Sequence, residues 1–314
     1  MTVISHVALD SLGVLRARGA DAASFLQGQL SNDLEQLGAE HSLLAGYHNP
    51  QGRAVALLRL LELAPGDLIA ILPRELLGAV AARLAKFILR AKVKLSDDSA
   101  AWSIVGLIAA DEPQQQPAAA AVPVTAALPA TLNSVTRVQG SLIVRVAAEP
   151  GRWLALRPAA AAALAPPAAG PGDAAPWERL AVMSGEPEVY AATSEQFVAQ
   201  MLNLDVLGGV AFDKGCYTGQ EVIARAHFRG RLKRRLQRFV TRAPQALGPG
   251  AAGQLTDGRA LKVVRAVQLP DGRCEFLAVA PLAIAAAAAG EAAAAEGSLS
   301  IDAEPLALPY ALPQ

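Results

Sequence analysis

The chain has 314 residues, 53% of which are hydrophobic, and its 28 basic residues balance its 28 acidic residues. This length suits about two domains. The zero net charge argues against a protein whose whole surface binds polyanions, and two distant cysteines outside any C-x-x-C motif exclude a disulfide framework and a self-contained metal site.

The first third of the chain alternates short strands with single helices. Apolar patterning predicts strands at Leu12–Ala17, Leu43–Tyr47, Ala54–Leu63, Leu68–Leu72, Val93–Leu95 and Trp102–Ala109. The segment Asn49–Gly52 has the composition of a turn between two of them. A helix is expected at Arg74–Leu89 with Pro73 at its first position, and a shorter helix should follow Asp21 as N-cap. This alternation predicts an α+β fold rather than a doubly wound sheet.

The middle of the chain is Ala/Pro-rich and the C-terminal part is β-like. Ala110–Ala130 and Ala159–Ala175 have poor periodicity, and each could be a loose helix or a linker. Strands are expected between them at Leu142–Val146 and Trp153–Leu156. Further short strands, separated by Pro-Gly and Asp-Gly turns, are expected at Phe239–Val240, Leu261–Val267, Cys274–Val279 and Leu299–Ile301. Regular turns between short strands predict a small barrel or sandwich.

No targeting segment is visible in the sequence. Met1–Asp10 has neither a basic n-region nor a long apolar region, and no apolar run of membrane length is free of charges and of Pro or Gly. We therefore expect a cytoplasmic protein that does not contact a membrane, in a reducing compartment that suits free thiols.

The stretch that carries chemistry is D-K-G-C-Y-T-G-Q-E, from Asp213 to Glu221, which leads into a helix-like run ending at Phe228. A helix N-terminus and the neighbouring Lys214 would both favour a thiolate at Cys216. The two glycines of the string suit positions of positive φ or of close backbone approach. The alternative is a buried cysteine that acts as a small hydrophobic residue beside an ordinary turn.

This string is similar to the K-G-C-Y-x-G-Q-E signature of the YgfZ family, folate-binding proteins related to the T-protein aminomethyltransferase of the glycine cleavage system. Other blocks that match the family are Arg18–Asp21, Phe25–Gln29, Asn49–Arg53, Gln200–Leu204, Gly208–Gly209 and His227–Arg235. The resemblance implies a folate-binding body of two related α+β subdomains at residues 1–235, divided near residues 100–110, and a C-terminal β-barrel at residues 236–314.

The resemblance also implies a function. The protein would be a tetrahydrofolate-binding accessory factor for the synthesis or repair of Fe–S clusters in a subset of enzymes, including tRNA-modifying ones. Cys216 would be the reactive thiol and a candidate transient cluster ligand, with Lys214 beside it. The implied folate contacts are Trp177, Tyr217, Gln220, Glu221 and Arg225. The implied partners are Fe–S client proteins or assembly factors, and we expect a monomer.

Three departures from related sequences bear on activity. The pterin-binding carboxylate of the aminomethyltransferase R-x-E-A-G block corresponds to Met183, and Arg53–Leu57 lacks the aspartate that those enzymes place after the turn. Leu12 replaces an aromatic residue that many relatives have near the first strand. We therefore expect no aminomethyltransferase activity and no classical enzyme activity. A tetrahydrofolate-dependent one-carbon transferase or demethylase is the alternative from another class.

A basic run follows the signature, because no acidic residue occurs from Val222 to Thr256. Its cations are Arg225, Arg229, Arg231, Lys233, Arg234, Arg235, Arg238 and Arg242. The run could be a solvated face or an anion site for a polyglutamylated folate tail, with Arg225 paired to Glu221 on a helix and the Arg231–Arg235 cluster free. An RNA-binding module is a third alternative. It ranks lower because the sequence suggests no aromatic interleaving, so direct nucleic-acid binding is not expected.

Overall fold

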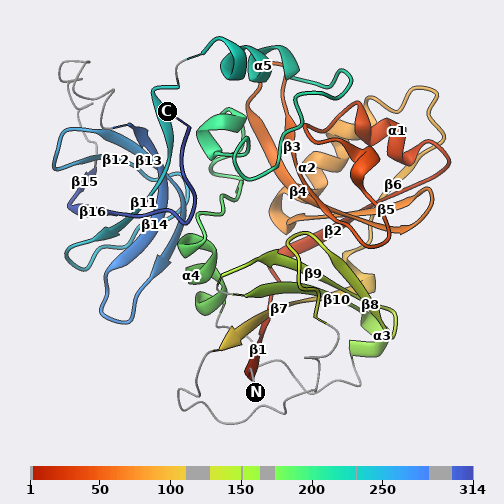
Figure 1. Cartoon of the computed structure of the whole chain (residues 1–314), viewed down its shortest axis with the longest axis horizontal. Helices are drawn as coiled ribbons and strands as arrows, with labels where there is room; N and C mark the ends of the chain where they lie inside the picture. Colours follow the sequence, from red (N-terminus) through yellow and green to blue (C-terminus); the bar gives the residue numbers. More distant parts are fainter. Residues whose placement is uncertain are drawn as a thin grey trace. The chain divides into compact units, whose positions relative to one another are not determined.

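The computed structural model describes residues 3–110, 128–149, 151–162, 174–230, 232–282 and 299–313 (Figure 1). Its contacts divide the chain into two compact units. The first unit comprises Met1–Gln29, Asp33–Ala45 and Leu58–Trp177, and the second comprises Leu30–Asn32, Gly46–Leu57 and Glu178–Gln314. The expected subdomain boundaries near residues 100–110 and at residues 235–236 stay predictions. The Ala/Pro-rich segments lie mostly outside the described residues.

One sheet has the order β3-β4-β5-β2-β6, and its pairs β4-β5, β5-β2 and β2-β6 are antiparallel. Its strands are β2 (Leu12–Arg18), β3 (Leu43–His48), β4 (Ala54–Ala64), β5 (Asp67–Pro73) and β6 (Lys94–Asp97). The predicted strands are therefore confirmed, with ends that differ by one or two residues. Helix α1 (Ala22–Gln27) has Asp21 at its N-cap, as expected, although the carboxylate forms no capping hydrogen bond.

Helix α2 (Arg74–Ala85) packs on β2, where a Cβ at Gly13 would lie 2.8 Å from Leu77. The expected continuation to Leu89 is wrong. From Lys86 onward the amides donate to carbonyls three or fewer residues back, so the helix tightens into turns and ends. As a result Phe87, which the periodicity assigns to the buried face, is 50% exposed. Pro73 is the N-cap residue rather than the first helical residue.

A second antiparallel sheet of the first unit has the order β1-β7-β10-β9-β8. Its strands are β1 (Val3–Ala8), β7 (Trp102–Ala110), β8 (Val135–Val138), β9 (Ser141–Ala147) and β10 (Arg152–Pro158). Val105, Leu107, Ile143, Trp153 and Ala155 form one apolar cluster on it. The short helix α3 (Ala159–Ala162) follows β10, and α4 (Ala175–Met183) begins at the end of this unit.

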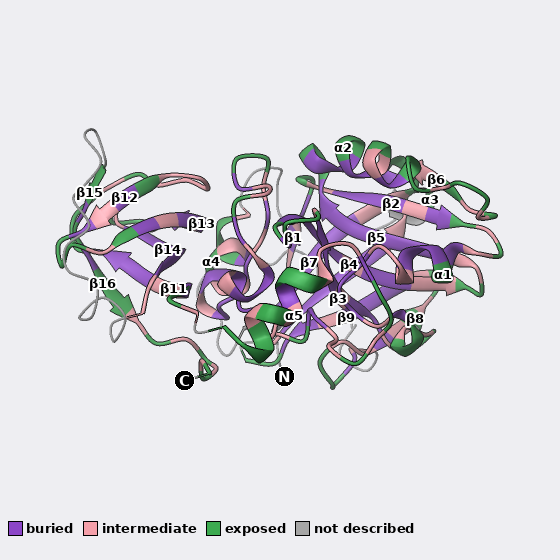
Figure 2. Ribbon diagram, turned by 90° about the horizontal axis from the view of Figure 1, so that it is seen from above, coloured by how far each residue is buried: buried purple, intermediate pink, exposed green. Residues whose placement is uncertain are grey.

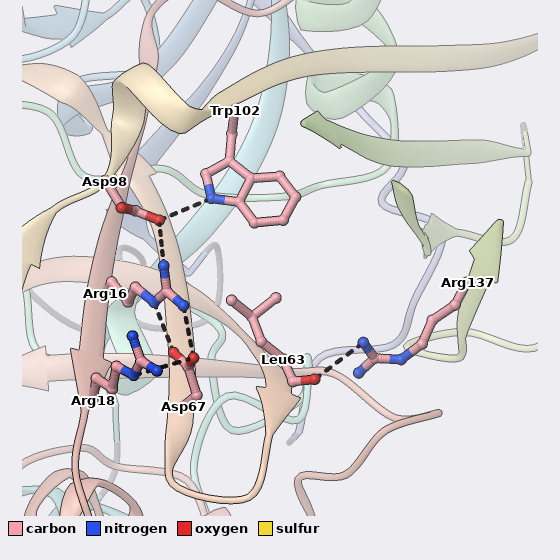
Figure 3. A network of polar contacts seen from close by, with 7 residues as sticks. All are labelled: Arg16, Arg18, Leu63, Asp67, Asp98, Trp102 and Arg137. Carbon is pink, nitrogen blue, oxygen red and sulfur yellow. Dashed lines mark hydrogen bonds and ion pairs between the residues drawn. The ribbon is translucent and has the colours of Figure 1, made fainter. Parts of the chain in front are cut away.

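A partly buried charged network joins β2 to β5 within the first unit (Figure 3). The guanidinium of Arg16 donates to both carboxylate oxygens of Asp67, at 2.7 and 2.6 Å, and to Asp98 at 3.2 Å. Hydrogen bonds from Arg16 hold the pKa of Asp67 below its ordinary value. The indole of Trp102 donates to Asp98 at 3.1 Å. We assign this network to the stability of the sheet.

The second unit contains a curled half-barrel sheet of order β15-β12-β13-β14-β11-β16. Its strands are β11 (Arg234–Thr241), β12 (Ala252–Leu255), β13 (Ala260–Gln268), β14 (Cys274–Pro281), β15 (Leu299–Ile301) and β16 (Ala303–Leu306). Phe239 and Phe276 stack in its core with ring centroids 5.5 Å apart. The predicted α+β class is confirmed. No helix within the described ranges is long and apolar enough to cross a membrane.

Candidate functional site

The signature loop (Asp213–Gly219) leads into helix α5 (Gln220–Phe228) in the second unit. The helix has the bounds that the sequence predicts. Gly219 is its N-cap with φ of 85°, and a Cβ at this position would lie 2.5 Å from the carbonyl oxygen of Asn49. A side chain is therefore excluded at Gly219 both by the backbone conformation and by the close approach of another loop.

The loop that approaches Gly219 is the Asn49–Gly52 turn, in which Gly52 has a φ of 70°. A Cβ on Gly52 would lie 3.0 Å from the Cβ of Val222, so two glycines let the turn and α5 meet.

Gly215 differs from the expectation of a positive φ or a close backbone approach. Its φ is not positive, and a Cβ there would meet no heavy atom of the chain within 4 Å beyond its neighbours in sequence. The loop faces open space at Gly215, so glycine is not required there.

The side chain of Asn49 builds the turn that receives the signature loop. Its Oδ1 accepts hydrogen bonds from the amides of Gln51 and Arg53, both at 3.0 Å. Its Nδ2 donates to Glu195 at 2.7 Å. This arrangement is an Asx-type turn that is fixed to a second loop, and it holds the surface against which α5 begins.

Lys214 braces the signature loop. Its Nζ donates to the carbonyl oxygens of Leu30 and Asn32, at 2.8 and 2.7 Å, and lies 5.2 Å from the ring centroid of Tyr217. The segment that receives it is itself fixed, because Ser31 Oγ donates to the Gly209 carbonyl at 2.6 Å. These two hydrogen bonds to the backbone fix the loop on which Cys216 sits.

Cys216 is exposed and Cys274 is buried. The alternative in which Cys216 fills a core is thus excluded, and the expected core position of Cys274 is confirmed. Burial raises the pKa of the Cys274 thiol, and Cys274 is 0% exposed. Among the described residues, no group of three or more His, Cys, Asp and Glu side chains could hold a metal ion.

The other signature residues differ in accessibility. Tyr217 is 7% exposed, and burial raises its pKa to about 12. Gln220 is half-buried, while Glu221 and Arg225 are exposed on α5. Glu221 and Arg225 both lie within the described residues and form no ion pair with each other. The expected pairing along the helix is therefore wrong. Their exposure leaves both charged groups accessible to a ligand.

Trp177 belongs to the first unit and is 5% exposed. The guanidinium carbon of Arg152 lies 4.7 Å from its ring centroid, and Arg152 is itself 0% exposed. A Cβ on Gly106 would lie 2.5 Å from the indole, so glycine lets the strand backbone approach the ring. The indole is therefore covered by its own unit and offers almost no open surface to a flat ligand.

The structure divides the basic run into bonded and exposed cations. Arg235 is buried and donates to both carboxylate oxygens of Asp205, at 3.0 and 2.9 Å. Arg238 donates to Glu275 at 2.7 Å. The expectation that the whole Arg231–Arg235 cluster is free is therefore wrong for Arg235. Arg231 lies outside the described residues. The cations that stay exposed, without an ion pair among the described residues, are Arg225, Arg229, Lys233 and Arg234.

The sequence analysis did not predict two features of the second unit. Phe212 stacks on His227 with ring centroids 3.7 Å apart, and Phe228 meets both rings edge-on. Arg265 forms a bidentate ion pair with Glu178, at 2.7 and 3.1 Å, across 87 residues. Spacing along the sequence gives no signal for contacts across such distances. The adjacent pair His227-Phe228, inside the basic run, was a signal for the aromatic cluster.

No family model matches the chain. The chain is 31% identical over 277 residues to a protein of Yersinia pseudotuberculosis (serotype IB, strain PB1/+) named tRNA-modifying protein YgfZ, covering 86% of this chain and 82% of that one. The protein of the same name from strain IP 31758 matches equally. A solved structure, the glycine cleavage system aminomethyltransferase T of Bartonella henselae, is similar with a TM-score of 0.66 and 16% identity, covering 89% of this chain and 78% of that chain.

Proposed function

The chain belongs to the YgfZ family, and on that premise we propose that it is a tetrahydrofolate-binding accessory factor for the synthesis or repair of Fe–S clusters in a subset of enzymes, including tRNA-modifying ones. Its fold is that of an aminomethyltransferase. Folate binding and action on Fe–S proteins are the proposed part. The relatives' name refers to tRNA modification, which an Fe–S accessory factor would support through its clients.

The observation that carries this proposal is an aminomethyltransferase-like fold without the acids of the transferase. By the family resemblance, Met183 stands where aminomethyltransferases have a carboxylate that accepts the pterin N–H groups. After the Asn49 turn, the residues Ala54–Leu57 are apolar and buried, each at most 4% exposed. Apolar side chains can neither accept a proton nor stabilise an iminium cation. The combination supports a binding protein rather than an aminomethyltransferase.

The second support is the exposed thiol of Cys216 on a loop that Lys214 fixes. One thiolate cannot hold a cluster alone, because Fe–S clusters usually have about four ligands. The thiol would therefore act in transfer, exchange or redox protection, together with ligands from a client or an assembly factor. The cluster in this proposal is cargo.

The residues present fit a folate in part. Gln220, Glu221 and Arg225 of α5 are accessible polar groups, and Arg225 could meet the carboxylates of the glutamate tail. Trp177 is covered by Arg152 and Tyr217 is buried, so neither ring supplies an open stacking face in this structure. We therefore propose weak binding, with Kd in the micromolar range or higher, corresponding to about −8 kcal/mol or a less favourable value.

Calorimetric titration with tetrahydrofolate tests the cofactor part. The native protein should bind at micromolar to millimolar ligand, and Arg225→Gln should weaken the binding more than Arg90→Gln, which removes an exposed arginine of the first unit. No detectable binding at millimolar tetrahydrofolate would remove folate from the proposal. The same preparation, supplied with a methylated amine and tetrahydrofolate, should show no turnover. Sustained turnover would favour the one-carbon transferase or demethylase.

A further inference from the structure

An aromatic–basic surface lies on helix α5 and on residues that flank it in the chain. We define it by the rings of Phe212, His227 and Phe228 together with Arg225 and Arg229. Phe228 lies at interplanar angles of 73° to Phe212 and 83° to His227, with centroid distances of 6.1 and 4.8 Å. Arg225 lies three residues before Phe228 on α5, so these two side chains are neighbours on the helix surface, and Arg229 follows directly as the C-cap residue.

The surface is open to solvent. Phe228 is 69% exposed, and Val222, six residues earlier on the same helix, is 37% exposed, although both are apolar. Helix α5 is coloured largely as exposed in Figure 2. Arg225 and Arg229 are exposed and have no ion pair among the described residues. Lys233 and Arg234, both exposed, continue the positive charge along the chain. Large exposed apolar groups among free cations mark a surface that binds a partner.

We propose that this aromatic–basic surface binds single-stranded RNA. Arginines beside an exposed ring provide the two contacts that an unpaired strand needs, charge for the phosphates and a flat face for a base. A duplex hides its base faces, so the rings would not contribute to binding one. A polyglutamate tail would use the cations but not the rings. The expectation against nucleic acid rested on missing aromatic interleaving, and the ring cluster removes that reason.

The same segment also carries the thiol. Phe212 stacks on His227 with ring centroids 3.7 Å apart, so the two ends of the segment between them lie together. Cys216 is part of this segment. An RNA strand held on α5 would therefore be bound to the helix that directly follows the loop carrying the thiol. The proposed accessory function requires no contact with RNA, so this inference goes beyond it, and RNA binding should not depend on the sulfur of Cys216.

The test is fluorescence anisotropy of a labelled oligouridylate of about 12 nucleotides, titrated with the full chain at low salt. Phe228→Ala should weaken binding about tenfold, as the loss of one stacked base predicts. Replacing Arg225 and Arg229 by glutamine should lower the slope of log K against log salt by about 1.4, since each single-strand phosphate contact contributes about 0.7. Cys216→Ser should bind as the native chain does.

Matched controls lie at the end of α2. Phe87→Ala removes a ring that is 50% exposed, and the pair Lys86→Gln and Arg90→Gln removes two exposed cations of the first unit. These variants should leave affinity and salt slope unchanged. If Phe228→Ala folds poorly, Phe228→Leu replaces it, because leucine keeps the apolar contacts and removes the ring. This variant should show the same loss of RNA affinity that is expected for Phe228→Ala.

Each of four outcomes would overturn the proposal. Equal losses in the control variants would mean that binding is general electrostatics. An unchanged affinity in both variants of Phe228, with displacement of the oligonucleotide by triglutamate, would make the surface a site for an anionic tail. Equal affinity for duplex RNA and for the single strand would exclude base stacking. If the oligonucleotide does not bind at low salt, the surface does not bind RNA, and an acidic protein becomes its expected partner.

Discussion

At the residue scale, the two thiols of this chain have opposite environments. Cys216 is exposed on the signature loop, whereas Cys274 is 0% exposed in β14 and burial raises its pKa. Alkylation by iodoacetamide near neutral pH, followed by mass spectrometry, should therefore modify Cys216 and spare Cys274. Both should react after unfolding. Equal rates in the folded protein would contradict the assignment of Cys216 as the reactive thiol.

Lys214 is expected to act on stability. Lys214→Met removes the ammonium from the carbonyls of Leu30 and Asn32, so the free energy of unfolding should fall by about 1–3 kcal/mol. Lys233→Met, at an exposed position, is the matched control and should change it by less than about 0.5 kcal/mol. Urea unfolding measures both. If Lys214→Met leaves stability unchanged and slows alkylation of Cys216, the ammonium acts on the thiol instead.

At the element scale, β11 carries two adjacent arginines with different roles. Arg235 is buried against Asp205, and Arg234 is exposed. Arg235→Gln leaves the buried carboxylate of Asp205 without its ion pair, which should cost about 3–5 kcal/mol of unfolding free energy. Arg234→Gln should cost less than about 0.5 kcal/mol. Denaturant unfolding of the two single variants measures the difference. Equal effects would contradict the division of the basic run into bonded and exposed cations.

Local patterns predicted elements well and long-range contacts poorly. The sequence predicts the bounds of α5, and it predicts a glycine of positive φ at Gly219, directly before this helix. The end of α2 did not follow from periodicity, because the apolar pattern continues to Leu89 whereas the hydrogen bonds tighten into turns from Lys86 onward. A long-range contact also fixes the chain beyond the helix, where the Lys92 amide donates to Asp21 at 2.6 Å, 71 residues away. Arg235 also differs from the expectation because of a long-range contact, since its partner Asp205 lies 30 residues earlier. The pairing partner, rather than the local run of charge, decides which arginines are free.

At the scale of the whole molecule, two titrating groups, the buried His48 and the half-buried Glu188, should give pH effects of opposite sign. Burial lowers the pKa of His48 to about 4, so the unfolded chain takes up its proton first as pH falls below about 6.5. Burial raises the pKa of Glu188 to about 7, so the folded chain takes up its proton first. Stability from His48 is lost as pH falls from about 6.5 to 4, and stability from Glu188 is lost as pH rises from about 4.5 to 7.

Single variants should separate these two contributions. Between about pH 4.5 and 6.5, His48→Gln removes the term that raises stability with pH, and Glu188→Gln removes the term that lowers it. Relative to the native chain, stability should therefore fall with pH in His48→Gln and rise with pH in Glu188→Gln, each by a slope of about one proton. Urea unfolding across this pH range measures the slopes. Curves parallel to that of the native chain would mean that neither group titrates differently on unfolding.

The fold class of the whole chain and its family could be read from the sequence, because the K-G-C-Y-x-G-Q-E string and the spacing of turns are local features. The accessibility of the candidate site could not. Trp177 and Tyr217 read as ligand contacts, yet packing covers both, with Arg152 and Gly106 against the indole. Burial depends on what the remainder of the fold places over a ring, and sequence spacing does not contain that information.

The central claim is that the exposed thiol of Cys216 supports Fe–S enzymes that modify tRNA. The most direct measurement is the content of methylthiolated nucleosides in tRNA, by mass spectrometry, from a strain that lacks this protein and is complemented with single variants. Cys216→Ser should fail to restore the modification, whereas Cys274→Ser, at equal protein level, should restore it. Full restoration by Cys216→Ser would contradict the claim.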